Sequence, residues 1–279
     1  MTSNHPKIKG ELKMNELKLK KKRESRKYLT ISLISLTIFF GIWYIATAVL
    51  KLMPDYSLPS PIQVIKGFAY KLDNVAPDGG TLFQHIIASL KVALSGYILG
   101  AIVGIPLGIC MAWFKKVDLL VTPLFDLIRP VPTIAWIPLM ILWFGIGLGA
   151  KAAIIFVSAF VPCVINSYAG IKQTKEVHLW VSQTFGASRT KMLFTVAIPT
   201  ALPLIFTGLR ISLGTAWMTL CAAEMLAANK GLGYMIQLNR ALARADLIIV
   251  GMLTIGLIGI ILTYFLEYVE KKVVRGGRR

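Results

Sequence analysis

The strongest constraint on this 279-residue chain is a series of long apolar segments separated by short polar ones. A transmembrane helix needs about 20 mainly apolar residues. Six segments meet this requirement, and they cover residues 28–50, 82–113, 119–144, 150–171, 192–228 and 247–269. Their apolar residues are continuous and do not alternate with polar ones, which favours helices over a barrel. We therefore expect an all-α polytopic membrane protein with six transmembrane helices.

The composition agrees with a lipid environment. Hydrophobic residues make up 56% of the chain and charged residues only 16%, whereas about 25% of residues are charged in soluble domains. The length suits one membrane domain over residues 28–270, flanked by basic tails at 1–27 and 271–279. No small-residue cleavage pattern follows the first apolar segment, so we interpret it as a retained span.

The formal net charge of +18 is concentrated near the two ends. Residues 1–27 contain ten Lys or Arg against three Glu, and residues 267–279 contain five against two. Cytoplasmic segments of membrane proteins are rich in cations, so we expect both termini in the cytoplasm. The same rule places residues 172–191 inside and residues 51–82, 147–149 and 229–246 outside. Binding of lipid or nucleic acid by the basic tail is the weaker alternative, and we expect no nucleic-acid partner.

Four glycines in the second apolar segment are spaced by four residues: Gly96, Gly100, Gly104 and Gly108. This spacing places them on one face of a helix, where they permit close approach of a second helix. Packing within one subunit and a seam between two subunits both fit the pattern.

The sequence contains none of the motifs expected of an enzyme or of an ATP-binding chain. There is no phosphate-binding loop of the form G-x-x-x-x-G-K-[ST], and the three histidines and three cysteines are scattered. We therefore expect no catalytic residues, no metal site and no cofactor bound by this chain. If the protein drives transport, the energy comes from a partner chain.

The segment "TKEVHLWVSQTFG" at residues 174–186 has the spacing of a short amphipathic helix. Its apolar stripe would consist of Val177, Trp180, Val181 and Phe185. Gly186 is expected to end this helix. An ordinary linker helix at the membrane interface is the alternative interpretation.

A second helix is expected directly after this glycine. Ser188 can cap a helix that begins at Arg189. Pro199 and Pro203 then interrupt the entry to the fifth apolar segment. The sequence therefore predicts a helix, a glycine turn and a second helix on the cytoplasmic side.

This loop resembles the EAA motif of permease subunits in type I ABC importers. The motif places a glycine four residues after Glu-Ala-Ala, followed by a hydrophobic residue and a Leu-Pro pair. Gly186, Val196 and Ile198–Pro199 match that spacing, while the triplet itself falls on Trp180, Val181 and Ser182, so the acidic residue is missing.

Further segments extend the resemblance over about residues 55–270. "SLPSPIQVIKGF", "GIPLGICMA", "RPVPTIAWIPLMILWFGIGLGAK" and the segment from "TALPLIFTGLR" to "GLGYMI" resemble the subgroup that imports nitrate, aliphatic sulfonates and taurine. The resemblance implies a type I importer permease fold in the cell membrane. It also implies a homodimer of this subunit, or a pair of two similar subunits, together with cytoplasmic ATPase subunits that use ATP and an external substrate-binding protein.

The resemblance further implies an ATPase-coupling surface on residues 172–191 and Pro199. Its expected members are Val177, Trp180, Val181, Ser182, Phe185, Gly186, Ala187, Ser188, Arg189 and Pro199. The solute would be a small anion of the sulfonate, nitrate or taurine type, and a vitamin precursor such as a pyrimidine or flavin is the alternative within the same machinery. A stand-alone channel or ion-coupled transporter is the alternative of another class.

Four residues are candidates for the substrate pathway, and three of them are charged groups, which are costly at membrane depth and tend to be functional. They are Arg129, Arg210, Trp217 and Glu224. Arg210 could attract an anion or pair with a carboxylate, and Arg129 could bind carbonyl groups freed by Pro130 and Pro132. Glu224 could pair helices or act as a gate, and Trp217 fits packing better than substrate stacking.

Overall fold

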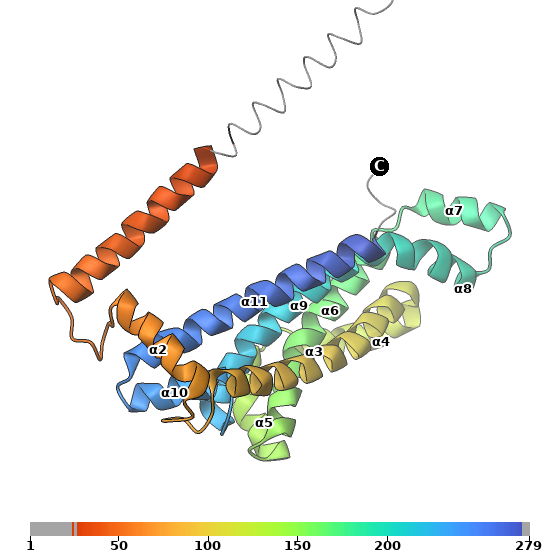
Figure 1. The fold of residues 1–279 in the computed structure, drawn as a ribbon. Helices are drawn as coiled ribbons and strands as arrows, with labels where there is room; N and C mark the ends of the chain where they lie inside the picture. Colours follow the sequence, from red (N-terminus) through yellow and green to blue (C-terminus); the bar gives the residue numbers. More distant parts are fainter. Residues whose placement is uncertain (1–23, 25–26, 275–279) are drawn as a thin grey trace, which may run out of the picture. The chain divides into compact units, whose positions relative to one another are not determined.

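The computed structural model describes residue 24 and residues 27–274, and the described residues contain helices and no strands. The expectations for the tails at residues 1–23 and 275–279 lie outside this part of the chain. The chain forms two compact units, residues 1–65 and 66–279 (Figure 1).

The first unit contains a helix over Lys27–Val49 that is long and apolar enough to cross a membrane. Its last turn is the π-helical η1 (Ile45–Val49). The indole of Trp43 donates a hydrogen bond of 3.0 Å to the carbonyl of Pro59. Ser60 and Gln63 then cap α2 (Pro61–Asp73) reciprocally, with Pro61 in the first helical position where its missing N–H costs nothing.

The second unit is built on three long helices, α3 (Leu82–Trp113), α6 (Leu148–Lys172) and α9 (Ile198–Ala227). α6 packs against both α3 and α9. α10 (Leu232–Ala241) and α11 (Ala245–Val273) pack against each other and against α9 (Figure 1).

The four-residue glycine ridge of α3 packs against α6 within the same subunit. A Cβ atom on Gly100 would lie 2.7 Å from Cβ of Ala159, and one on Gly108 would lie 2.4 Å from the carbonyl oxygen of Val164. Only glycine allows the two backbones to approach this closely. Of the two interpretations left open by the sequence, the structure supports packing inside one chain.

The third predicted span is broken. α4 (Lys115–Ile128) is followed by η2 (Thr133–Trp136) and α5 (Ile137–Phe144), with a bend of 86° at the break. Proline restricts the residue before it and removes a backbone donor, so Pro130 and Pro132 explain why the helix ends there. The described residues hold five helices able to span a membrane, or six if this bent pair counts as one span.

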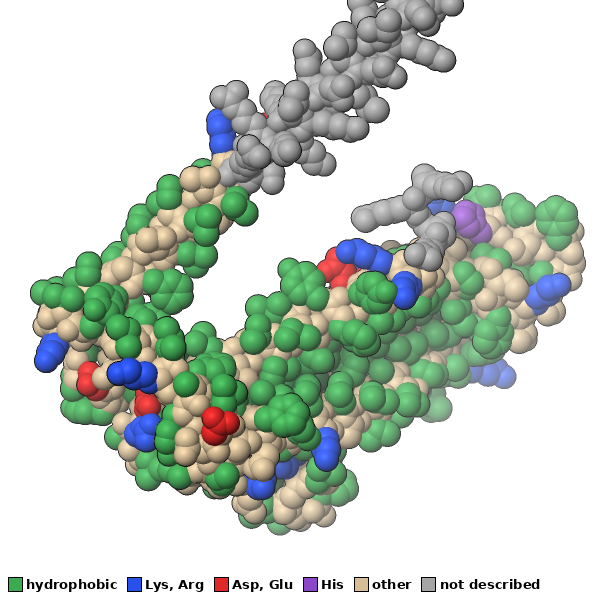
Figure 2. Space-filling view, viewed as in Figure 1, with side chains coloured by type: hydrophobic (Ala, Val, Ile, Leu, Met, Phe, Trp, Pro, Cys, Tyr) green, Lys and Arg blue, Asp and Glu red, His purple; other side chains and the backbone are tan. Residues whose placement is uncertain are grey.

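Large apolar side chains remain exposed over the long helices. On α11 alone, Leu253, Leu257 and Ile261 are each more than half exposed. The face in Figure 2 is mainly hydrophobic, as expected for helices that lipid or another subunit covers. The polar stretches at residues 51–82 and 229–246 contain the helices α2 and α10, which the span analysis of the sequence did not predict.

Candidate functional site

The predicted surface loop forms as expected, with α7 (Glu176–Thr184) and α8 (Arg189–Met192) joined by a tight turn. Gly186 has φ +75°, a conformation that favours glycine. Its N–H donates to the carbonyl of Gln183, and the N–H of Ala187 donates to that of Ser182, at 2.9 and 3.1 Å. These two bonds form a Schellman motif, which ends α7.

α8 is fixed at its start and tied to the bundle. The hydroxyl of Ser188 accepts a hydrogen bond from the N–H of Lys191, as the sequence predicted for a helix cap. The guanidinium of Arg189 donates to the carbonyl of Trp113 at the end of α3, at 3.2 Å. After α8, η3 (Leu193–Ala197) leads into α9, where Pro199 occupies the first turn.

The apolar stripe of α7 faces away from the rest of the described chain. Val177, Trp180, Val181 and Phe185 are 57, 59, 51 and 86% exposed, and no residue of α7 is buried. Apolar side chains of this size that remain exposed together mark an interaction surface. The loop therefore presents a fixed hydrophobic face at one end of the bundle (Figure 1).

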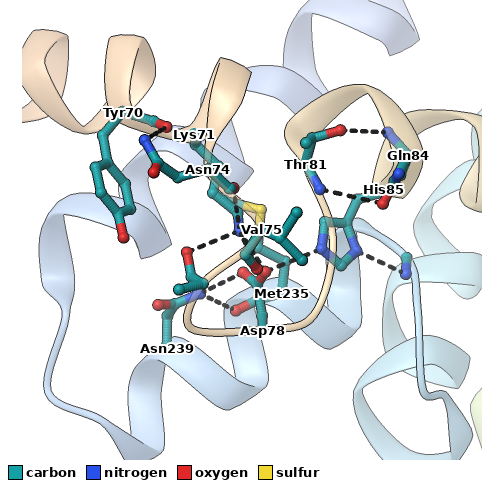
Figure 3. A network of polar contacts seen from close by, with 12 residues as sticks. Tyr70, Lys71, Asn74, Val75, Asp78, Thr81, Gln84, His85, Met235 and Asn239 are labelled. Carbon is teal, nitrogen blue, oxygen red and sulfur yellow. Dashed lines mark hydrogen bonds and ion pairs between the residues drawn. The ribbon is translucent and has the colours of Figure 1, made fainter.

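The opposite end of α3 contains a buried polar network. Asp78 is 2% exposed and lies between the ammonium of Lys71 and the imidazole of His85, both fully buried. Asn239 of α10 donates to the second oxygen of Asp78 at 3.0 Å (Figure 3). The sequence assigned Lys71 and Asp78 only to an outside segment, and nothing in the local pattern indicated that the two charges pair inside the protein.

Hydrogen bonds also fix the tautomer of His85. Its Nδ1 accepts from the N–H of Gly231 at 3.1 Å, and its Nε2 lies 3.1 Å from the carboxylate of Asp78. Nδ1 is therefore unprotonated, and Nε2 carries the proton that it donates to Asp78. Burial raises the pKa of Asp78, but hydrogen bonds from His85 and Lys71 outweigh burial and lower this pKa to about 2.

A second buried group, Glu224 of α9, anchors the start of α10. Its carboxylate accepts from the hydroxyl of Ser89 at 2.8 Å and from the N–H of Gly233 at 2.9 Å. The N–H of Leu232 in turn donates to Ser89 at 2.8 Å. The free N–H groups of a helix start favour a negative charge, so this geometry fits the structural interpretation of Glu224. A role as a gate stays a prediction.

The four pathway candidates are not brought together. Arg210 forms an ion pair of 3.0 Å with Glu270, and Trp217 donates to the carbonyl of Ile255, so both join α9 to α11. Arg129 pairs with Asp126 at 3.3 Å, with both side chains half exposed, in place of the expected contact with freed carbonyls. Each candidate has a local partner, and their role in a pathway remains a prediction.

The bundle, the broken span and the protruding loop agree with the fold of the inner-membrane permeases of ABC importers. The chain belongs to the family described as "binding-protein-dependent transport system inner membrane component", whose model matches residues 104–275. The family and the type I fold expected from the sequence are confirmed. The side of the membrane on which each terminus lies remains a prediction.

Individual relatives agree with this family. The taurine transport system permease protein TauC of Escherichia coli K12 is 36% identical over 265 residues, which cover 94% of each chain. The nitrate import permease protein NrtB of Synechocystis is 34% identical over 222 residues, 78% of this chain and 81% of NrtB. The solved MetNI methionine ABC transporter, in inward-facing conformations, matches with TM-score 0.59 and 20% identity over 71% of this chain and 96% of that one, which shows the fold.

Proposed function

We propose that this chain is the transmembrane subunit of an ATP-driven importer for a small anionic solute of the sulfonate, nitrate or taurine type. Two copies form the pathway, an external binding protein delivers the solute, and ATP is bound and hydrolysed by cytoplasmic partner chains. The permeases for taurine and nitrate among its relatives support the solute class. Both of those solutes carry an anionic oxyacid group.

The observation that carries the proposal is the exposed apolar stripe of α7. Such a stripe is costly in water unless a partner covers it. The turn at Gly186 and the bond from Arg189 to Trp113 hold α7 and α8 at the ends of α3, α6 and α9. A partner that pushes on α7 therefore moves three long helices together. The missing acid of the motif removes a charge contact and leaves the apolar contact as the main one.

The test is capture of the candidate ATPase by the tagged, full-length protein in detergent. Trp180→Ala combined with Phe185→Ala removes the largest side chains of the stripe. Trp143→Ala is a matched control, because Trp143 on α5 is 60% exposed against 59% for Trp180. We expect the double variant to capture at least tenfold less ATPase than the wild type does. The control should capture as much as the wild type. Equal capture by all three proteins would contradict coupling through α7.

A further inference from the structure

A pocket of about 420 Å³ opens where the first turns of α3 and α6 meet the loop between α9 and α10. Its volume falls within the range of small-ligand sites. α3 is 32 residues long, about 48 Å, and carries the pocket in its first three turns and Trp113, which contacts Arg189, at its other end. The pocket therefore lies at the end of the bundle opposite α7, which we expect to face the external binding protein.

The charge of the pocket is entirely positive. Lys91, Lys151 and Lys230 line it together with the amide side chains of Gln84 and Asn229, and none of its lining residues is acidic. None of the three ammonium groups lies within 4.0 Å of a carboxylate in the described part of the chain. Three cations without an ion-pair partner thus converge on one concave surface.

Among the three lysines of the pocket, Lys151 is the one whose burial needs an explanation. Lys91 and Lys230 are exposed and can be solvated by water, but Lys151 is only 8% exposed. A buried ammonium without a partner is costly. Lys151 also lies in the first turns of α6, where the helix dipole disfavours a cation. This arrangement is stabilised when an anion occupies the pocket.

Glu224 interacts electrostatically with Lys151, but its carboxylate is already hydrogen-bonded. Its carboxylate lies beyond ion-pair distance from Lys151 and accepts hydrogen bonds from Ser89 and Gly233. It weakens the positive field at Lys151 but forms no ion pair with the ammonium. The pocket thus retains a net positive field, suited to a single small anion.

We infer that this pocket binds the anionic oxyacid group of the imported solute, a sulfonate or a nitrate, at the entrance of the permease. This inference rests on the proposed function. It assigns the anion contact to Lys91, Lys151 and Lys230, and not to Arg210, whose guanidinium is paired with Glu270.

The test is binding of ethanesulfonate and nitrate to the full-length protein in phosphatidylcholine nanodiscs. Ethanesulfonate is followed by saturation-transfer NMR, which detects weak binding, and nitrate by its competition with ethanesulfonate. We expect Lys151→Gln to raise the Kd for ethanesulfonate at least tenfold, and Lys91→Gln combined with Lys230→Gln to do the same. The latter two residues are exposed, so this variant keeps the test valid if Lys151→Gln fails to fold. Lys66→Gln, an exposed lysine of α2 outside the pocket, is the charge-matched control and should leave Kd within twofold.

Three results would overturn the inference: no binding of either anion by the wild type, equal losses in the Lys66 control, or unchanged Kd in both pocket variants. Phosphatidylglycerol nanodiscs separate the two sources of an anionic oxyacid group. Unchanged affinity there supports the solute, whereas abolished binding at high salt, where the surface potential of the lipid is screened, shows that an anionic lipid headgroup occupies the pocket and overturns the assignment. The binding titration needs no ATPase, so a negative result there says nothing against coupling through α7. A negative result in the ATPase capture likewise leaves the binding titration interpretable.

Discussion

At the scale of single residues, Asp78 links the loop between α2 and α3 to α10. Its carboxylate holds two cationic or hydrogen-donating groups, Lys71 and His85, and the amide of Asn239. Removing one partner of a buried ion pair leaves the other charge uncompensated and costs about 3–5 kcal/mol. We expect Asp78→Asn to lower the free energy of unfolding by this order, measured by thermal melting in detergent at pH 7. Asp55→Asn is the control, because Asp55 contacts Gln63 at an exposed site.

The same residue predicts a response to acid. The pKa of Asp78 is lowered from 3.8 to about 2, so the folded protein holds the proton less tightly than the unfolded chain does. The stabilisation is therefore complete above pH 3.8 and is lost as the pH falls from about 3.8 to about 2. Melting curves over this window should show a smaller loss of stability in Asp78→Asn than in the wild type. Parallel curves would exclude Asp78 as the titrating group.

At Gly231 the structure leaves no room for a side chain. A Cβ atom there would lie 2.3 Å from the carboxyl carbon of Glu224, and its φ of +135° strains any other residue. We expect Gly231→Ala to cost at least about 2 kcal/mol, since both overpacking and backbone strain contribute. Gly214→Ala has open space around it and should leave the melting temperature nearly unchanged. Similar melting of the two variants would mean that α10 is not locked by this network.

The sequence revealed few of these single-residue roles. Lys71, Asp78 and His85 are spaced by seven residues across a turn, but Asp78 and Asn239 are separated by 161 positions. Their pairing depends on how α10 packs, which no local pattern encodes. The buried charge of Asp78 is an exception to the general expectation that loop charges are solvated.

At the scale of elements, the turn between α7 and α8 depends on one conformation. Gly186 and Gly145 have nearly equal φ values, +75° and +72°, and at neither glycine does any neighbouring atom lie within 4 Å of the place that a Cβ would occupy. Gly145 also has ψ 175°, a region that only glycine populates readily, so alanine at either site adds backbone strain of about 1–3 kcal/mol without a clash. Because Gly145 ends α5 and Gly186 orients α7, we expect only Gly186→Ala to weaken ATPase capture.

The measurement is the amount of ATPase that each alanine variant captures, relative to the wild type. The two variants are compared once their melting temperatures have been found equal. Gly186→Asn should restore most of the capture, since asparagine tolerates this conformation better than alanine does. If Gly145→Ala weakens capture as much as Gly186→Ala, the effect comes from general strain and the coupling role of this turn is wrong.

Local sequence patterns predicted the long elements well and the short ones unevenly. The glycine turn and the Ser188 cap follow from local chemistry, and both appear as expected. α10 was missed because its buried residues, Leu232, Met235 and Asn239, lie in a segment that is polar overall. The glycine ridge of α3 predicted a close helix contact, but its partner α6 became evident only in the folded bundle.

At the scale of the whole molecule, the apolar face of α7 and the basic pocket lie at opposite ends of the same helices. α3 reaches from the pocket at Lys91 to the contact of Trp113 with Arg189. α3, α6 and α9 are packed through glycines and small side chains, so we expect a displacement at one end to be transmitted to the other. An importer needs this arrangement, whereas a stand-alone channel would need no docking surface.

We propose that an ATPase drives transport through this chain. The most direct measurement is accumulation of labelled taurine, ethanesulfonate and nitrate in proteoliposomes that contain the permease, its ATPase and its binding protein. We predict that at least one of the three solutes accumulates above its outside concentration only when ATP is hydrolysed, and that Trp180→Ala with Phe185→Ala abolishes this accumulation. Equal anion flux without the ATPase, or in the presence of a non-hydrolysable nucleotide, would contradict this mechanism and identify a channel or an ion-coupled transporter.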